Sequence, residues 1–209
     1  MISTEFPQSW YPICLSSEVS LGRVIAVQGL GTVWAVCRFD DGRVGVLHHR
    51  CSHSGADLCR GRVTGHCLQC PLHHWEFDGA GACRRIPGAD SIPEKTGQFA
   101  LPVEEHFGMV FAFLGDAPLF PFPVSNESGT YRRGPIYQDT FPVPYPMVGF
   151  NSFDEGHLGP VHARELIGVP TIEVRSQFEI GMEYRARVAG RRLRDRLVRR
   201  IGLSDVHMA

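Results

Sequence analysis

Two short segments of the sequence each carry one cysteine and one histidine. Cys51 and His53 are separated by one residue and Cys70 and His73 by two, with 16 residues between the two pairs. Thiolate sulfur and imidazole nitrogen are protein ligands for both iron and zinc. Residues i and i+2 of an extended segment share a face, so the first pair can present both side chains to one centre. The spacing predicts a metal site built from two loops.

A binuclear [2Fe–2S] cluster is the centre that this mixed ligand set favours. One form of that cluster takes two Cys on one iron and two His on the other, so each loop can supply one ligand to each iron. A tetrahedral zinc site is the alternative, because Cys67 and Cys70 also form a C-x-x-C pair. Zinc modules usually group their ligands as Cys-Cys and then His-His, which disfavours zinc here.

A second polar group lies much further along the chain. Its members fit the pattern N-x-x-D-x-x-H-x4-H and are Asn151, Asp154, His157 and His162. On an unbroken α-helix the two histidines would point roughly 140° apart, but Gly159-Pro160 between them can interrupt a helix. Two His and one carboxylate are the ligand set of mononuclear non-haem Fe(II) sites. Asp154 and Asn151 also suit the beginning of a helix, as a dipole partner and a cap.

The segments around these motifs closely resemble the Rieske domain and iron motif of the ring-hydroxylating Rieske non-haem iron oxygenases. The segments that carry the resemblance are Trp10-Tyr11-Pro12-Ile13, Cys51 to Ala56, Cys70 to Gly79, Ile86-Pro87-Gly88 and Asn151 to His162. The resemblance implies that Cys51, His53, Cys70 and His73 hold the [2Fe–2S] cluster. It also implies that His157 and His162 bind Fe(II), and that Asp154 links a neighbouring subunit's cluster to this iron.

The family relationship carries further expectations about activity and partners. It implies a homotrimer that receives electrons from a ferredoxin or a flavin reductase. It also implies use of O₂ to hydroxylate or demethylate an organic small-molecule substrate. The competing interpretation is a Rieske-type electron-transfer protein without a working mononuclear iron site.

Three features of the sequence bear on these expectations. His74 occupies the place of a glycine that usually follows the second ligand histidine. Ala56 and Leu72 stand where respiratory Rieske proteins carry a disulfide, which favours the oxygenase class. The family's third iron ligand, a distant Asp, has no counterpart at its usual place, which predicts a truncated catalytic domain or a different completion of the site. The remaining candidates are Glu165, Glu173, Glu179, Glu183, Asp195 and Asp205.

Composition excludes several other classes of protein. The formal net charge is −1, with 21 basic and 22 acidic residues, so no overall field favours nucleic acid. No apolar run reaches the ~20 residues of a membrane span, and residues 1–10 do not resemble a secretory signal. The odd count of 7 cysteines argues against a disulfide framework and predicts a cytoplasmic protein.

The elements that must position these residues are mainly short strands. The predicted fold is mainly β / α+β, with an antiparallel β Rieske domain at 1–118 and an incomplete α+β catalytic domain at 119–209, joined by a Pro/Gly/Ser-rich stretch. Asp41-Gly42 predicts a hairpin turn. Strands are expected at Arg23–Val27, Thr32–Arg38, Val44–Leu47, Phe99–Val103, Met109–Leu114, Tyr131–Val143, Ile172–Ile180 and Met182–Val188. Helices are expected at Asn151–Leu158 and within the basic segment Gly190–Gly202.

Overall fold

The computed structural model describes residues 6–124, 139, 141–144, 146–200 and 205–208 of the 209-residue chain. The chain divides into two compact units, and the division falls inside residues 125–138, which are not described. None of the helices in the described residues is long and apolar enough to cross a lipid bilayer.

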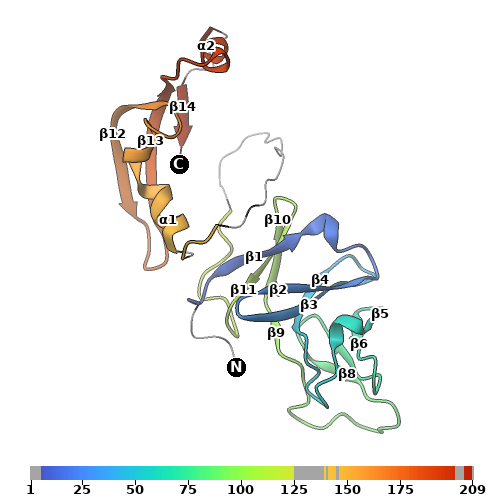
Figure 1. The fold of residues 1–209 in the computed structure, drawn as a ribbon. Coiled ribbons are helices and arrows are strands. Elements are labelled where there is room, and N and C mark those ends of the chain that lie inside the picture. The colour runs from blue at the N-terminus through green and yellow to red at the C-terminus, as the bar shows by residue number, and fades with distance from the viewer. Residues whose placement is uncertain (1–5, 125–138, 140, 145, 201–204, 209) are drawn as a thin grey trace. The chain divides into compact units, whose positions relative to one another are not determined.

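The first unit consists of short antiparallel strands and two 3-10 helices (Figure 1). Its strands form three sheets, with the orders β1-β11-β10, β2-β3-β4-β9 and β5-β6-β7-β8. The elements are β1 (Trp10–Leu15), η1 (Ser16–Glu18), β2 (Val24–Gly29), β3 (Thr32–Arg38), β4 (Val44–His48), η2 (Leu58–Arg60), β5 (Arg62–Thr64), β6 (Cys67–Gln69), β7 (Glu76–Asp78), β8 (Cys83–Arg85), β9 (Ala100–Leu101), β10 (Val103–His106) and β11 (Met109–Phe113).

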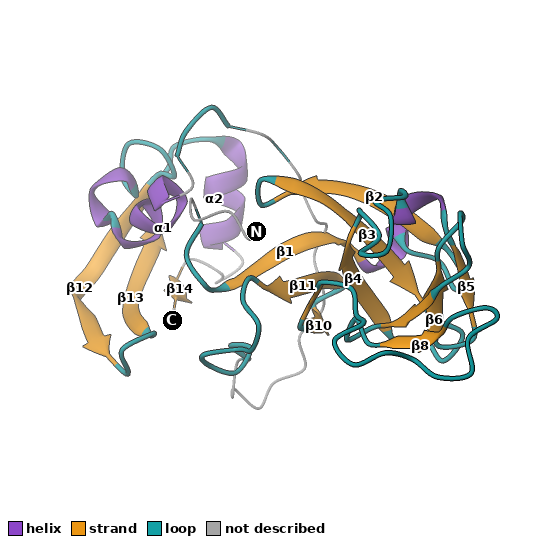
Figure 2. Cartoon of the chain, turned by 90° about the horizontal axis from the view of Figure 1, so that it is seen from below, coloured by secondary structure: helices purple, strands orange, loops and turns teal. Residues whose placement is uncertain are grey.

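Strand β3 is the centre of this unit because both of its faces are buried. Successive side chains of a strand point to opposite faces. Trp34 and Val36 accordingly pack in a core with residues of β11, whereas Ala35 and Cys37 pack in a second core with Cys51 and Cys70. Figure 2 shows β2 and β3 between the β1–β11 side and the small β5–β8 sheet. The second core therefore lies directly behind the two predicted metal-binding loops.

Several predicted strands match the structure closely. The prediction Thr32–Arg38 coincides with β3, and β4 and β11 differ from their predictions by one residue at the C-terminal end. Gly42 has φ +86° in the turn between β3 and β4, a conformation that glycine adopts without strain. The predicted strand Phe99–Val103 is instead divided between β9 and β10, with Pro102 between them.

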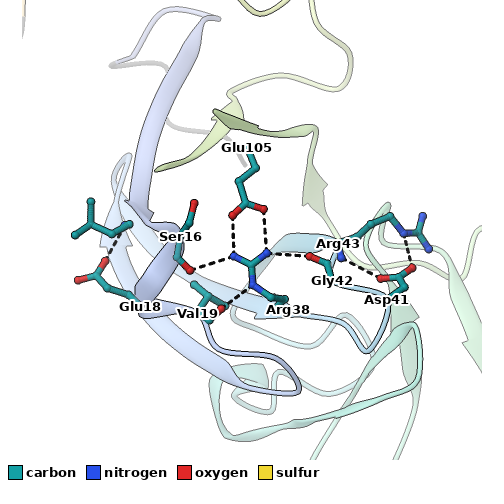
Figure 3. Close-up of polar contacts among 9 residues, drawn as sticks. Ser16, Glu18, Val19, Arg38, Asp41, Gly42, Arg43 and Glu105 are labelled. Atoms are coloured by element: carbon teal, nitrogen blue, oxygen red, sulfur yellow. Dashed lines mark hydrogen bonds and ion pairs between the residues drawn. The ribbon is translucent and has the colours of Figure 1, made fainter. Parts of the chain in front are cut away.

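Arg38, at the end of β3, binds three parts of the first unit together (Figure 3). Its guanidinium forms a two-pronged ion pair with Glu105 of β10, with N–O distances of 2.8 and 2.9 Å. It also donates to the backbone oxygens of Ser16, Val19 and Gly42. Hydrogen bonds from Arg38 hold the pKa of the Glu105 carboxyl below its usual value. The central sheet is thereby fixed to the β1-β11-β10 sheet.

The second unit is an antiparallel sheet with helical segments. Its elements are α1 (Pro146–Phe153), η3 (Glu155–His157), β12 (Arg164–Val174), β13 (Ile180–Val188), α2 (Leu193–Arg200) and β14 (Asp205–Met208), and its sheet has the order β12-β13-β14. The antiparallel β domain followed by an α+β unit confirms the predicted fold class. The prediction Tyr131–Val143 falls almost entirely outside the described residues.

The predicted helix Asn151–Leu158 is displaced in the structure. Helix α1 begins at Pro146, because proline has a fixed φ that suits the first turn, and it ends at Phe153. A separate 3-10 helix, η3, then covers Glu155–His157. Asn151 consequently lies inside α1 and does not cap it. Asp154 caps η3, with its carboxylate accepting from the Gly156 N–H at 2.9 Å.

Candidate metal centre

The structure brings the four predicted cluster ligands into two contacts, Cys51 with Cys70 and His53 with His73. Cys51 follows β4, and Cys70 begins the loop between β6 and β7. The two thiols are buried, at 3% and 1% exposure, and they hydrogen-bond to each other. The His53 and His73 side chains are exposed, with their ring centroids 4.7 Å apart. Sulfur thus lies on the inner side of the site and imidazole on the outer side.

The two loops are closed by equivalent backbone hydrogen bonds. The Cys51 N–H donates to the Ala56 carbonyl at 2.8 Å, and the Cys70 N–H donates to the Trp75 carbonyl at 2.8 Å. The residue before each acceptor is in the left-handed region, with φ +75° at Gly55 and φ +58° at His74. The unusual His74 therefore occupies a position where glycine avoids a steric cost.

Backbone donors also point at the Cys51 sulfur. Burial raises the pKa of the Cys51 thiol, while hydrogen bonds from the backbone N–H groups of His53 and Ser54 act in the opposite direction. Such donors stabilise a negatively charged sulfur. Two paired buried thiols, two adjacent imidazoles and N–H donors aimed at sulfur are a donor set that fits a [2Fe–2S] cluster with Cys and His ligands.

The imidazoles are oriented by side chains of the loops themselves. The His53 ring stacks on the Trp75 indole at a centroid distance of 4.2 Å and an interplanar angle of 7°. The Ser54 hydroxyl oxygen lies 3.4 Å from Nδ1 of His73. These contacts restrict the rotation of both rings, which a pair of metal-binding imidazoles requires.

Buried polar side chains lie beside both loops, and they could not be identified from the sequence. Gln98, only 7% exposed, accepts from the Ser52 N–H at 2.8 Å. Gln69 and Glu76, on either side of the second loop, hydrogen-bond to each other at 2.7 Å. Arg85 contacts the same Glu76 carboxylate at 2.9 Å. For Gln69 and Glu76, position directly beside the second loop was the available signal, and it does not reveal where a side chain points; Gln98 is distant in sequence from Ser52 and gave no such signal.

In the second unit, the two predicted iron-binding histidines lie side by side. The His157 and His162 ring centroids are 5.0 Å apart. Nδ1 of His157 faces Asp154, whose carboxylate oxygen is 3.6 Å away and whose backbone oxygen is a hydrogen-bond partner. The backbone changes from 3-10 at η3 to i→i−4 bonds at residues 161–163, with Pro160 unable to donate. A single straight helix is therefore absent from residues 155–163.

The acidic residues considered as a third iron ligand are partly engaged elsewhere. Arg175 forms ion pairs with Glu173, Glu179 and Glu183 at 3.1, 3.2 and 3.5 Å. Asp195 is buried near the start of α2 and accepts from the Arg192 N–H at 3.2 Å. Among the described residues, no three His, Cys, Asp or Glu side chains are grouped to hold a single metal ion.

Comparison with known proteins identifies the family. Residues 9–99 match the Rieske [2Fe–2S] domain. The chain is 31% identical over 173 residues to aminopyrrolnitrin oxygenase of Pseudomonas fluorescens, covering 77% of this chain and 47% of that protein. It is 32% identical over 162 residues to the iron–sulfur subunit of the toluene-4-sulfonate monooxygenase system of Comamonas testosteroni, covering 75% and 46%.

A solved structure agrees with these sequence matches. Dicamba monooxygenase bound to dicamba superposes with a TM-score of 0.60 at 25% identity, over 88% of this chain and 57% of that chain. The chain spans less than half the length of the two curated relatives, at 47% and 46%. Residues 9–99 belong to the Rieske [2Fe–2S] domain family, and over about three quarters of its length the chain is similar to Rieske non-haem iron oxygenases.

Proposed function

We propose that the chain forms the cluster-bearing part of an oxygenase component, in which electrons accepted at a [2Fe–2S] cluster support O₂-dependent hydroxylation or demethylation. The observation that carries this proposal is the pairing of buried Cys51 with Cys70 and of exposed His53 with His73, one member of each pair on each loop. The bound cluster supplies storage of one electron. A ferredoxin or a flavin reductase is the proposed electron donor.

The cysteine and histidine side chains would have different roles in holding a [2Fe–2S] cluster. The side chains of Cys51 and Cys70 are buried and would hold the group on its inner side, away from solvent. The imidazoles bring no negative charge, which favours the reduced state relative to an all-cysteine site. Because His53 and His73 are exposed, a ring nitrogen that does not bind iron is available for a hydrogen bond. The whole ligand set belongs to the first unit.

For the second unit, we propose that His157 and His162 contribute to a mononuclear Fe(II) site. The adjacent rings at 5.0 Å and the carboxylate of Asp154 beside His157 support this assignment. Asp154 would orient the His157 ring by engaging Nδ1, which leaves Nε2 for the metal. The relatives named above act, by their names, on aminopyrrolnitrin, toluene-4-sulfonate and dicamba, and a small organic molecule is the proposed substrate class here.

The remaining features of this proposal concern organisation. We propose that the Rieske and catalytic parts divide in the segment that follows residue 118, and that the working assembly is a homotrimer in the cytoplasm. The boundary follows from the Pro/Gly/Ser-rich stretch, the compartment from the odd number of cysteines and the trimer from the family relationship. Size measurement of the purified protein by light scattering tests the trimer.

A second candidate function is an electron carrier that has the cluster but no working mononuclear iron. The engagement of Glu173, Glu179 and Glu183 by Arg175 favours it, because these carboxylates are held by a cation. An electron carrier needs only the first unit's ligand set.

Metal analysis of anaerobically purified protein separates the two candidates. Three irons and two sulfides per chain, with O₂ consumed on reduction, support the oxygenase component. Two irons and no uptake of added Fe(II) support the carrier. A colourless protein that holds zinc contradicts both.

A further inference from the structure

Gln98 lies between the first cluster loop and the rest of the domain. Its side chain is 7% exposed. Its Oε1 accepts from the Ser52 N–H at 2.8 Å, and its Nε2 donates to the carbonyls of His48 and Arg50 at 2.6 and 2.9 Å. Both amide hydrogens and the amide oxygen are thus used, and every partner is a backbone group of the segment that carries Cys51.

The Gln98 side-chain hydrogen bonds begin where the backbone pairing between β4 and β9 ends. Strand β9 pairs with β4 through Ala100 and Leu101, and the Phe99 carbonyl accepts from the His48 N–H at 2.8 Å. Beyond that point no further β4–β9 pair is formed, and the Gln98 side chain contacts residues 48, 50 and 52 instead. Residues 48, 50 and 52 alternate along an extended segment, so their backbone groups lie on the same edge. The single Gln98 amide makes the hydrogen bonds that a neighbouring strand would otherwise make to this edge.

The backbone of Gln98 is itself fixed to the other side of the site. Its N–H donates to the Gly81 carbonyl at 2.7 Å, and Gly97 bridges to Ala82 beside β8. A Cβ at Gly81 would lie 1.9 Å from the Gln98 carbonyl oxygen, so this close approach requires glycine. Gln98 therefore connects the first loop to the turn before β8, in the sheet that carries the second loop.

We propose that Gln98 is a positioning residue that sets the reduction potential and the lifetime of the cluster. By taking the Ser52 N–H, it fixes the peptide that joins Ser52 to Cys51. The next two N–H groups, of His53 and Ser54, then point at the Cys51 sulfur. Hydrogen bonds to ligand sulfur favour the reduced cluster and raise its potential. The inference rests on the proposed assignment of Cys51 and His53 as ligands.

The test is Gln98→Met in the full chain, compared with the unchanged protein after anaerobic purification. Methionine keeps the volume and removes all three hydrogen bonds. We expect the cluster's reduction equilibrium to become about tenfold less favourable, which is about 59 mV for one electron. We also expect shifted g-values in electron paramagnetic resonance and faster loss of the cluster's visible absorbance in air.

Gln69→Met is the matched control. Gln69 is equally buried, at 5% exposure, and precedes Cys70 directly, but its amide contacts the Arg62 and Glu76 side chains and no loop backbone. We expect it to lower the unfolding temperature and to leave the potential unchanged. Equal shifts of potential in both variants would reduce Gln98 to a general structural role and overturn the proposal.

Gln98→Asn provides a second variant should the methionine variant fail to fold. Asparagine keeps a buried amide, but its side chain is one methylene shorter and cannot reach Ser52, His48 and Arg50 together, so a smaller loss of potential and lifetime in the same direction is expected. An unchanged potential and lifetime in the folded variant overturns the inference alone. Absence of a [2Fe–2S] spectrum from the unchanged protein overturns the ligand assignment instead.

Discussion

At the scale of single residues, the candidate cluster site separates its two ligand types by burial. Cys51 and Cys70 are at most 3% exposed, whereas His53 and His73 are exposed. A thiolate carries a full negative charge and an imidazole none, so exchanging one type for the other changes the charge of the bound group without changing the loops.

His53→Cys is the first prediction at this scale. A third thiolate adds negative charge to the cluster, so its potential should fall toward the roughly −400 mV of all-cysteine plant-type clusters, by on the order of 100 mV or more. The [2Fe–2S] absorbance should persist in some form. Redox titration monitored by that absorbance measures the shift, and an unchanged potential would remove His53 from the ligand set.

His74→Gly is the second prediction at the scale of single residues. A non-glycine residue in the left-handed region costs roughly 1–2 kcal/mol, part of which glycine returns through its greater freedom when unfolded. We expect a net gain of about 0.5–1 kcal/mol in the free energy of unfolding, measured by guanidinium denaturation of the cluster-loaded protein. Gly55→Ala, at φ +75° in the other loop, should change stability in the opposite direction. A loss of stability in His74→Gly would show that the histidine side chain contributes a contact.

At the scale of elements, the ion pair between β3 and β10 makes stability depend on pH. The Arg38 hydrogen bonds lower the pKa of Glu105 below its ordinary 4.5, so the carboxylate stabilises the fold above that pH. This contribution is lost as the pH falls through the lowered pKa. Because Glu105 is 35% exposed in its side chain, we expect only about 1 kcal/mol from the pair.

Glu105→Gln tests this sign. The variant should be less stable than the unchanged protein by a constant amount between pH 5 and about 8, and the difference should shrink as the pH falls below about 4.5. Chemical denaturation at several pH values measures it. A difference that grows in acid would contradict the assignment of the charged pair.

The strands that could be predicted are those with clear turns and β-branched runs, such as β3 and β4 on either side of Asp41-Gly42. Strand β1 was not predicted because Pro12 interrupts its alternating pattern. The structure places β1 at the edge of its sheet, with a register shift after Pro12. Strands β5 to β8 have three residues each, too short for alternation to show. Strand β12 begins eight residues before its prediction, because Gly168 and a register shift break the pattern.

The candidate site likewise contains some residues that a local sequence pattern reveals and others that only the tertiary structure reveals. The ligand pairs are local patterns, so Cys51, His53, Cys70 and His73 could be proposed from spacing. Gln98 could not, because it lies 46 residues from Ser52 in sequence and its contacts exist only once β9 pairs with β4. The family resemblance predicts a third iron ligand, and no particular carboxylate could be assigned to that role.

At the scale of the whole molecule, the described residues after 118 are part of the packing of the first unit. The Trp10 indole N–H donates to the Phe120 carbonyl at 3.1 Å, and the Phe122 ring stacks on His106 at 4.5 Å. Phe122 also lies 4.7 Å from Phe111. The segment that leaves the Rieske domain therefore continues its aromatic core for several residues beyond the predicted boundary.

A comparison of two shortened chains tests this boundary. Residues 1–124 should retain the cluster and its potential, because every described contact of the ligand loops lies inside the first unit. Residues 1–118 should be less stable by roughly 1–3 kcal/mol, since two half-buried phenylalanines are lost. Thermal unfolding of both cluster-loaded chains measures this, and equal stability would place the boundary at 118.

The stacking of Trp75 on His53 has a practical consequence. Of the 3 tryptophans, Trp75 is the one whose ring contacts a proposed ligand, 4.2 Å away. Iron held there would quench the indole's emission, whereas the emission of Trp10 and Trp34 would change less. Cluster loss should brighten the protein, and Trp75→Phe should remove most of that increase. The fluorescence of Trp75 would therefore report how much of the protein holds the cluster.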